Sequence, residues 1–415
     1  MNLRLSLRPT LVLVASLGLA ACSPAAPSAP TAAPTAPVAA KPAAASTPGA
    51  GTTGQAASGE PVKIGLSAAF TGPTAYLGQS AQNAVQMAVD AYNAKGGMKG
   101  RPVQIVTEDN QNQPSVAVTS VRKLIDSDGA VAVLGELGSS VTIASMPVFL
   151  EKKVPNIAYV DTNAKIYDMM GAGGNPWAFR INADDNTMAQ PFADLAQQLH
   201  KSYAIIAQND DFGRGAQAIY APLFSKSGVK VTSSNYYDIG TADFRPILTK
   251  VKAENPEAIF YIGLANDGAV MFHQYAELGM TQPVVSRGAL ATNEFIDRIK
   301  DIPHVADGVQ EAIVWTPGED PDMEAEYQQR YGQPVVVHGA MAYYAWQTLQ
   351  HALDIATAPD SQAIRDAIAK VDFEQRGLGP IKFDDHNQAY PNMALATIED
   401  GKIKFLKTLP TAKKG

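Results

Sequence analysis

A glycine followed by two serines, Gly138-Ser139-Ser140, forms the stretch of this sequence with the clearest chemistry. It stands directly before residues 141–150, whose apolar spacing predicts a helix. The first N–H groups of a helix have no acceptor within the helix, and the helix dipole makes that end positive. Together with a serine hydroxyl, such an end suits a carboxylate. A serine here can also be no more than the helix N-cap, and the sequence leaves both roles open.

The motifs of common enzyme classes give no sign of catalysis. No Gly-x-Ser-x-Gly elbow, His-Glu-x-x-His motif or P-loop occurs in the sequence. Ser120 and Lys123 have the Ser-x-x-Lys spacing, but they lie in a predicted amphipathic helix without the companion motifs. The six histidines are scattered and have no metal-ligand spacing among themselves. We therefore expect no catalytic residue, no cofactor and no metal.

The amino terminus has the features of an export signal. Arg4 and Arg8 precede an apolar segment, residues 11–19, that is too short to span a bilayer. Small residues then lead to Cys22, the only cysteine in the chain, which therefore has no disulfide partner. This arrangement is similar to the lipobox of bacterial lipoproteins, so we expect Cys22 to carry a lipid anchor. An ordinary cleaved signal with an incidental cysteine is the alternative.

A tether follows the predicted anchor. Residues 23–59 consist mostly of Ala, Pro, Ser, Thr and Gly, and Lys41 is their only charged residue. Such a segment buries too little apolar surface to offset the entropy of ordering it. We expect it to be disordered, with the folded part beginning at Glu60.

Length and charge narrow the class of protein further. A chain of 415 residues, 46% apolar and 18% charged, is long enough for two domains. Its formal net charge of −7 argues against nucleic acid or an anionic membrane surface as a partner, because both attract basic faces.

Short apolar strands alternate with amphipathic helices from Val62 onward, and the alternation begins again near Tyr203. The expected strands are Val62–Ala68, Val103–Val106, Val131–Leu134, Val154–Ala158, Tyr203–Ala207, Val229–Tyr236, Ala258–Ile262 and Val284–Ser286. The expected helices are Ala81–Ala94, Val116–Ile125, Val141–Leu150, Arg214–Ser227, Phe244–Glu254, Asp267–Leu278, Val337–Thr357 and Ser361–Lys370. This pattern predicts the α/β class, with two doubly wound parallel-sheet lobes.

In such sheets ligands bind at the carboxyl ends of the strands and in the loops that follow them. The loops expected at strand ends are residues 69–78, 135–140, 159–162 and 208–213. We expect the ligand to contact these four loops.

Several motifs in the folded part resemble, in a consistent order, those of the periplasmic leucine/isoleucine/valine-type (type I) solute-binding proteins of ABC transporters. The resemblance runs from about residue 61 to 407 and rests on Thr71-Gly72-Pro73, Asn93-Ala94-Lys95-Gly96-Gly97, Gly100-Arg101-Pro102-Val103, Gly135 to Ser140, Phe179-Arg180, Asp211-Phe212-Gly213 and Gly379-Pro380-Ile381. It implies two lobes joined by a hinge that the chain crosses three times, near Ile181, Ile313 and Tyr390.

The resemblance also implies how the chain is divided. The expected parts are residues 1–21 as lipoprotein signal, 22–59 as tether, 60–181 with 313–389 as lobe 1, and 182–312 with 390–415 as lobe 2. Arg180 and Asp185, near the first crossing, are expected to brace the hinge.

The resemblance further implies a set of ligand-binding residues. Gly138, Ser139 and the backbone at Val160 and Thr162 would hold a ligand carboxylate in lobe 1. Tyr76 and Leu77 would form the wall of a side-chain pocket, and Phe212 would close over it from lobe 2.

Lobe 2 departs from the family at two positions. Amino-acid binders usually present an acid to the ligand ammonium, but the matching stretch here is Ser286-Arg287-Gly288-Ala289. Ala265 occupies the place after the third strand of this lobe where an aromatic residue is often found, and it would face the ligand there. Arg287 would take a second anionic group or else face solvent from a loop. Asp267 or Glu311 would supply the missing acid from elsewhere, and the ligand's identity stays open.

The resemblance and the residues together predict an extracytoplasmic lipoprotein, on the periplasmic side in a Gram-negative cell. We expect a monomer that captures a small carboxylate or branched-chain-type amino acid and delivers it to an ABC permease, with no nucleic-acid partner. The alternatives are a sensor subunit that signals to a membrane receptor, and a binder of an amide, urea or aromatic acid.

Overall fold

The computed structural model describes residues 58–135 and 138–411. The predicted signal, Cys22 and nearly all of the tether lie outside the described residues. Among the helices that the structure describes, none combines the length and apolar character needed to cross a membrane.

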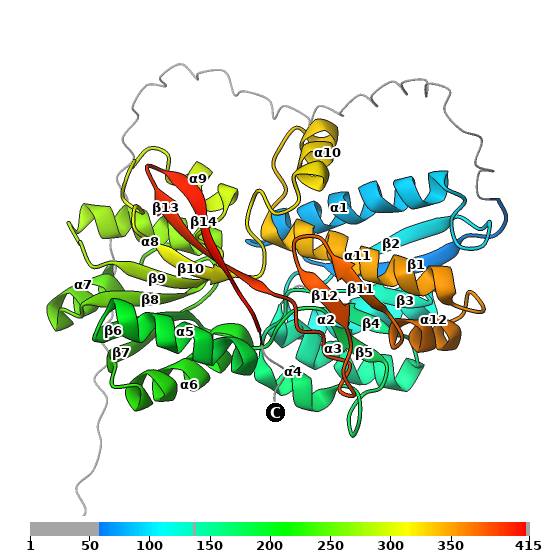
Figure 1. The fold of residues 1–415 in the computed structure, drawn as a ribbon, viewed down its shortest axis with the longest axis horizontal. Helices are drawn as coiled ribbons and strands as arrows, with labels where there is room; N and C mark the ends of the chain where they lie inside the picture. Colours follow the sequence, from blue (N-terminus) through cyan, green and yellow to red (C-terminus); the bar gives the residue numbers. More distant parts are fainter. Residues whose placement is uncertain (1–57, 136–137, 412–415) are drawn as a thin grey trace, which may run out of the picture. The chain divides into compact units, whose positions relative to one another are not determined.

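The first sheet is parallel throughout, with strand order β2-β1-β3-β4-β5 (Figure 1). Its strands are β1 (Val62–Ala68), β2 (Val103–Asp109), β3 (Ala132–Leu134), β4 (Asn156–Ala158) and β5 (Ala178–Arg180). Helices cover both faces, because two separate apolar cores pack against this sheet. One core contains residues of α1 (Ala75–Ala94) and α11 (Val337–Ile355), and the other contains residues of α2 (Pro114–Asp126) and α3 (Ser139–Lys152).

The second sheet has strand order β14-β13-β10-β9-β8-β6-β7. Its strands are β6 (Ser202–Gln208), β7 (Lys230–Tyr237), β8 (Ala258–Gly263), β9 (Val284–Gly288), β10 (Gln310–Ile313), β13 (Met393–Glu399) and β14 (Lys402–Leu409). Five neighbouring strands, β10, β9, β8, β6 and β7, are parallel, whereas β13 and β14 add an antiparallel hairpin at one edge. The α/β class is confirmed, and this sheet is mixed.

Helices also cover both faces of the second sheet. They are α5 (Asp185–Leu199) and α6 (Asp211–Lys226) over one core, and α7 (Arg245–Glu254), α8 (Ala265–Glu277) and α9 (Asn293–Arg298) over the other. The short helix α4 (Ala164–Met169) lies between β4 and β5 in the chain.

The segment after β10 returns to the first sheet. It contains α10 (Pro321–Tyr331), α11, α12 (Ser361–Ile368) and the two-stranded hairpin of β11 (Asp372–Gln375) and β12 (Gly379–Lys382). Trp315, Tyr327, Trp346 and Ile381 from this segment belong to the same apolar core as β1. We propose the division into two lobes at the three predicted crossings, since each crossing lies where the chain leaves one sheet for the other.

Helices α1, α3 and α6, which follow expected binding loops, begin earlier than the sequence predicted. α1 begins at Ala75, six residues early, because Gly78 lets the helix pack on the end of β1, where an added Cβ would lie 1.9 Å from the Ala69 carbonyl oxygen. α3 begins at Ser139 and α6 at Asp211. Part of three of the four expected loops is therefore helical, and Tyr76, Leu77 and Phe212 occupy first turns of helices.

Four helices were not expected from the sequence, namely the short α4 and α9 and the longer α5 and α10. α5 contains Pro191, which obscures its helical pattern, and α10 is rich in polar residues. Both begin at aspartate N-caps, Asp184 and Asp320, whose side chains accept hydrogen bonds from backbone N–H groups of the first turn.

Arg180 joins two of the crossings. It ends β5, is fully buried, and donates from Nε to Oε1 of Gln388 at 2.6 Å and from Nη1 to the Asn163 carbonyl at 2.9 Å. Its Nη2 lies 3.6 Å from Oδ2 of Asp184, and its carbonyl accepts from the N–H of Ala389 at 2.9 Å. The expectation that Arg180 braces the crossing between the sheets agrees with these contacts.

We predict that Arg180→Leu lowers the free energy of unfolding by about 3–5 kcal/mol, because it leaves the buried carboxylate of Asp184 without its cation. Urea unfolding followed by circular dichroism measures this change. Arg122→Leu is the control, since Arg122 is exposed and pairs with exposed Glu151, so little change is expected. Equal effects of the two substitutions would contradict the role given to Arg180.

Candidate functional site

A cavity of about 90 Å³ lies between the carboxyl ends of strands from both sheets. Seven of the nine residues predicted to bind ligand line it, namely Leu77, Gly138, Ser139, Val160, Thr162, Phe212 and Arg287. Apolar side chains, including Met188, Leu264, Ile313 and Val337, form much of the remaining wall. The contacts of these residues with a ligand stay a prediction.

The start of α3 provides the donors of the first-sheet side. Gly138 occupies the N-cap with a φ of 131°, a region that favours glycine, so the alternative of a serine N-cap is wrong. Ser139 is 1% exposed, and its Oγ accepts from the backbone N–H of Asn163 at 3.3 Å. The Ser139 hydroxyl can therefore still donate its own hydrogen into the cavity.

Ser140 has a different role from Ser139. Its Oγ accepts a hydrogen bond from the backbone N–H of Asp211, at the start of α6, at 3.0 Å. Ser140 therefore joins the first-sheet side to the second-sheet side beside the cavity.

The loop after β4 contributes a carboxyl that sequence reasoning did not identify. Asp161 is 1% exposed, and its Oδ1 accepts from the backbone N–H of Gly138 at 3.2 Å. Burial raises the pKa of Asp161 to about 7, although the nearby Arg180 charge and the Gly138 N–H lower it. A group that is partly neutral at pH 7 therefore lies next to the positive end of α3.

The backbone carbonyls of the residues on either side of Asp161 accept hydrogen bonds from the segment after β5. The Val160 carbonyl accepts from Nδ2 of Asn182 at 2.9 Å, and the Thr162 carbonyl accepts from the N–H of Asp185 at 2.8 Å. The Thr162 hydroxyl is buried and has no hydrogen-bond partner among the described residues. It is a second donor for a ligand carboxylate.

Arg287 provides the cationic group of the second-sheet side. It lies in β9 and is 4% exposed, so the alternative of a solvent-facing loop residue is wrong. Its Nη2 lies 2.7 Å from Oδ1 of Asp185, and its guanidinium carbon lies 5.1 Å from the centroid of the Phe212 ring. Burial raises the pKa of Asp185 to about 6, although the Arg287 charge lowers it. The pair brings little net charge to the cavity.

Neither acid suggested by the sequence lines the cavity. Asp267 accepts from the N–H of Gly240 at 3.0 Å. Glu311 accepts from Oγ of Ser286 at 3.1 Å and from the N–H of Ala291.

Asp210, the N-cap of α6, is the acid that lines the cavity. Its two carboxylate oxygens accept from the N–H of Gly213 at 3.0 Å and from Nε2 of Gln208 at 2.6 Å, and burial raises its pKa. The side-chain oxygens of Asn182 and Gln208 have no hydrogen-bond partner among the described residues. The expectation that ligands bind at the carboxyl ends of strands indicated the loop that contains Asp210. No pattern in the sequence distinguishes Asp210 from its neighbour Asp211.

His338 is a further lining residue that the sequence did not identify. It lies in the first turn of α11 and is 8% exposed, and its Nδ1 has no hydrogen-bond partner in the described part of the chain. Burial lowers the pKa of His338 to about 4, so the ring is neutral at pH 7. It offers the ligand a hydrogen bond without a charge.

Two predicted residues lie outside the cavity. Ala265 is fully buried at the start of α8 in the core of the second sheet, and its neighbour Leu264 lines the cavity. Tyr76 lines a different cavity, where the guanidinium carbon of Arg298 lies 5.3 Å from its ring centroid. The predictions that these two residues contact the ligand do not fit the cavity.

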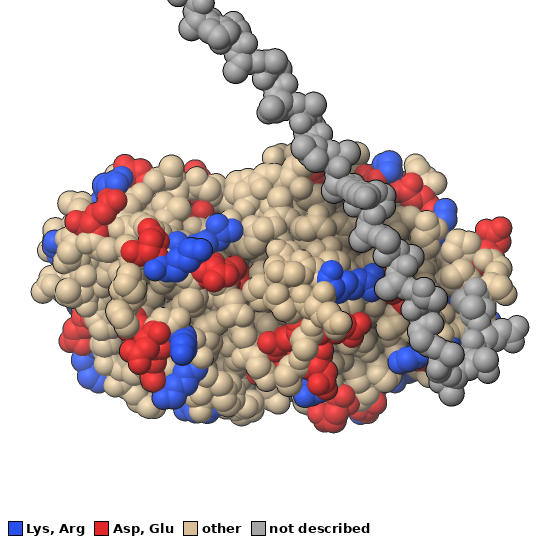
Figure 2. Space-filling model, turned by 90° about the horizontal axis from the view of Figure 1, so that it is seen from above, with Lys and Arg blue, Asp and Glu red and all other residues tan. Residues whose placement is uncertain are grey.

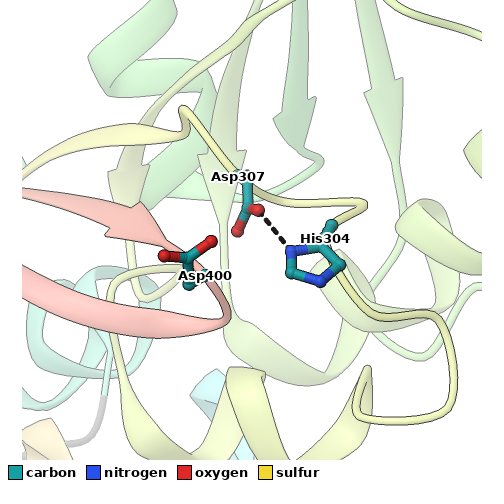
Figure 3. Close-up of side chains that lie close together, drawn as sticks. All are labelled: His304, Asp307 and Asp400. Carbon is teal, nitrogen blue, oxygen red and sulfur yellow. Dashed lines mark hydrogen bonds and ion pairs between the residues drawn. The ribbon is translucent and has the colours of Figure 1, made fainter.

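One group of possible metal ligands exists among the described residues (Figure 3). His304, Asp307 and Asp400 are exposed, and their ligand atoms lie within 4.8 Å of one another. Nδ1 of His304 lies 2.7 Å from Oδ2 of Asp307, whose other oxygen accepts from the N–H of Gly401 at 3.0 Å. None of the three lines the cavity.

The surface charge shows no continuous basic area on the face in view. Figure 2 shows Lys and Arg side chains interspersed with Asp and Glu side chains over this face.

Comparison with known proteins gives both relatives and structural neighbours. The chain is 28% identical to an amino acid binding protein of Pseudomonas aeruginosa over 56% of this chain and 62% of that protein, which is less than two thirds of its length. It is 25% identical to the Leu/Ile/Val-binding protein homolog 2 of Brucella abortus, over 83% of this chain and 93% of that protein.

Two solved structures have the same fold at low sequence identity. The branched-chain amino acid transporter substrate binding protein LivJ of Streptococcus pneumoniae, in complex with isoleucine, has a TM-score of 0.76 at 22% identity and covers 85% of this chain and 100% of its own. A solute binding protein of R. palustris, in complex with benzoate, has a TM-score of 0.75 at 19% identity and covers 86% of this chain and 98% of its own.

The sequence profile of the periplasmic binding proteins matches residues 61–402, which is well over half of the chain and includes the first sheet and all but the last strand of the second. The chain therefore belongs to the periplasmic binding protein family.

Proposed function

We propose that this chain is the extracytoplasmic solute-binding subunit of an ABC importer, and that it captures a small carboxylate in the cavity between its lobes. The observation that carries the proposal is the cavity lining. Ser139, at the start of α3, lines the cavity on the side of the first sheet. Arg287 and Phe212 line it on the side of the second sheet. A ligand bound to both halves stabilises the arrangement in which the lobes meet.

Contacts on two sides of the cavity support capture by closure. On one side, Ser140 accepts from the Asp211 N–H, and Nδ2 of Asn163 donates to the Asp211 carbonyl. On the other side, Nδ2 of Asn266 donates to the Pro73 carbonyl at 3.2 Å. These few polar contacts can break when the lobes separate, and ligand binding then shifts the population toward the closed form.

The polarity of the cavity supports an amino-acid-like ligand with an apolar body. The hydroxyls of Ser139 and Thr162 are donors suited to a carboxylate. Asp210 and the side-chain oxygens of Asn182 and Gln208 are acceptors, and they suit the N–H groups of an amine. The relatives named for leucine, isoleucine and valine, and the neighbour with bound isoleucine, support a branched-chain amino acid.

A second candidate is a carboxylate without an amino group, such as an aromatic acid. The observation that favours it is Arg287, which stands in the stretch where an acid was expected and stacks on Phe212. Loss of that acid weakens the binding of an ammonium group. The neighbour in complex with benzoate supports this candidate.

A thermal-shift screen with branched-chain amino acids, aromatic acids, amides and urea identifies the ligand. We expect a small carboxylate to raise the melting temperature, by an amount that grows with the logarithm of the ratio of its concentration to its dissociation constant. A branched-chain amino acid as the best ligand supports the first candidate, and benzoate as the best ligand supports the second. No shift with any carboxylate would contradict both.

We predict that Ser139→Ala weakens binding of that carboxylate by roughly 1–3 kcal/mol, because a hydroxyl donor to the charged group is lost. Titration calorimetry measures the affinity. Ser145→Ala is the matched control, because Ser145 lies on the same helix, outside the cavity, and donates to the Val141 carbonyl. Unchanged affinity in Ser139→Ala would refute the role of Ser139.

We predict that carboxylate binding strengthens several-fold as the pH falls from 8 to 6. Over this range Asp161, with a pKa of about 7, gains a proton and ceases to repel an anion at the start of α3. Asp185, with a pKa of about 6, begins to release Arg287 and acts in the same direction.

Asp161→Asn should flatten this pH dependence in calorimetry at pH 6, 7 and 8. Asp267→Asn is the control, because Asp267 has a pKa of about 6 but accepts from the N–H of Gly240 and not from the start of α3. Wild-type pH dependence in Asp161→Asn would show that another group is responsible.

We also propose that the chain is a monomer held to a membrane by lipid on Cys22, with residues 22–59 as its tether. Two or more acyl chains are needed for stable anchoring. Cys22→Ala should move the exported protein from the detergent phase to the aqueous phase in Triton X-114 partitioning. Ser23→Ala, beside it, should leave the protein in the detergent phase, and the same distribution for both variants would argue against the anchor.

A further inference from the structure

A second cavity, of about 440 Å³, lies beside the first and is lined from both lobes. Residues of α1, α9 and the loop before α11 line it, chiefly Tyr76, Ser80, Glu294, Asp297, Arg298 and Val336. Tyr76 and Val336 belong to a small apolar cluster with Leu77, a residue of the first cavity. The two cavities therefore share a wall.

Glu294 is a buried carboxyl that has no counterion among the described residues. Glu294 is 9% exposed and forms no ion pair among the described residues, and the groups that favour its charged form by hydrogen bonding are the Thr292 side chain and its own backbone N–H. Glu311, which is also buried, accepts from both Ser286 and Ala291. Because a buried carboxylate without a counterion is costly, Glu294 stands out as a group that lacks a cation.

Burial raises the pKa of Glu294 to about 8, and the charge of Glu311 raises it as well. The polar groups of Thr292 and of the Glu294 backbone lower this pKa, as does the nearby Arg298 charge, but burial outweighs them. A bound cation would lower it further.

Tyr76 provides the second group suited to a cation. Its hydroxyl is buried, makes no hydrogen bond to a side chain of the described residues, and lies near the backbone of Asn266. The face of its ring attracts the guanidinium of Arg298, whose central carbon lies 5.3 Å from the ring centroid. A carboxylate, a hydroxyl and an aromatic ring thus line one cavity.

The charge of the lining favours a monovalent cation. Buried Glu294 carries one negative charge when ionised, whereas Asp297 and Arg298 are both exposed and their opposite charges offset each other. The formal charge of the lining is then −1, which a single positive charge neutralises.

We propose that this second cavity binds a small organic cation with N–H donors, of the primary ammonium class, between Glu294 and Tyr76. Both lobes contribute to the cavity, so a cation bound there stabilises the arrangement in which the lobes meet. By linkage it strengthens carboxylate binding in the first cavity, and the reverse also holds. This coupling rests on the proposed function, whereas binding of the cation does not.

The test titrates ethylammonium chloride into the full chain, without any carboxylate ligand, by calorimetry at pH 7. We expect saturable binding, at least tenfold weaker binding of tetramethylammonium, which has no N–H donor, and at least tenfold weaker binding in Glu294→Gln. Asp297→Asn is the matched variant, with less than a threefold loss because the exposed charge of Asp297 is screened by salt.

Proton release gives an independent readout of the contact. At pH 7 Glu294 is largely protonated, so binding a cation must expel its proton. The charged and titratable groups around it are Tyr76 on α1, Asp297 and Arg298 on α9 and Glu311 on β10. Titration in two buffers of different ionisation heat should show proton release in wild type and none in Glu294→Gln.

The proposal is overturned if ethylammonium does not bind, if tetramethylammonium binds equally well, or if Glu294→Gln binds with wild-type affinity. If Glu294→Gln fails to fold, Tyr76→Phe decides instead, with an expected loss of at least threefold. Failure of the carboxylate screen would leave ethylammonium binding unaffected, so the two proposals fail separately. Ethylammonium binding without any gain in carboxylate affinity would reject the coupling alone.

Discussion

A buried arginine at the junction of the two sheets is the interaction on which the rest of the structure depends. Arg180 has no exposed surface, and its partners come from three segments of the chain. Asn163 lies before the first crossing, Asp184 lies after it, and Gln388 lies next to the third crossing. A buried guanidinium is stable only when hydrogen bonds and an opposite charge offset the loss of its hydration. This requirement holds the first and third crossings together, and the carboxyl ends of both sheets then meet at one cavity.

Ionisable side chains buried in and around the cavity are either paired with an opposite charge or kept neutral. Arg287 is paired with Asp185, whereas Asp161 is held partly neutral because burial raises its pKa to about 7. His338 is neutral because burial lowers its pKa. The donors of Ser139 and Thr162 therefore meet a ligand carboxylate in surroundings of low net charge, where hydrogen bonds are stronger than in water. Glu294 in the neighbouring cavity is also largely protonated at pH 7, because burial raises its pKa to about 8, and it forms no ion pair among the described residues.

Several elements show why sequence reasoning reached the loops of the site but not all of its residues. Strand and helix periodicity indicated the loop from residue 208 to 213, yet it could not distinguish Asp210, which lines the cavity, from Asp211, which contacts Ser140. The early start of α1 turns Tyr76 away from the first cavity, and it depends on Gly78 fitting against the end of β1. His338 comes from α11, a helix that reaches the site only because the chain returns to the first sheet.

The sequence by itself determined the α/β class, the two repeated halves and the membership of the family, because these follow from local periodicity and from motifs contiguous in the chain. It also indicated Ser139, since a helix start carries its donors wherever the helix lies. Only the tertiary structure decided that Arg287 is buried against Asp185, that Ala265 is a core residue, and that Asp161 and Asp210 are the acids beside the ligand cavity. Burial and charge pairing depend on segments distant in sequence, and no local pattern of residues encodes them.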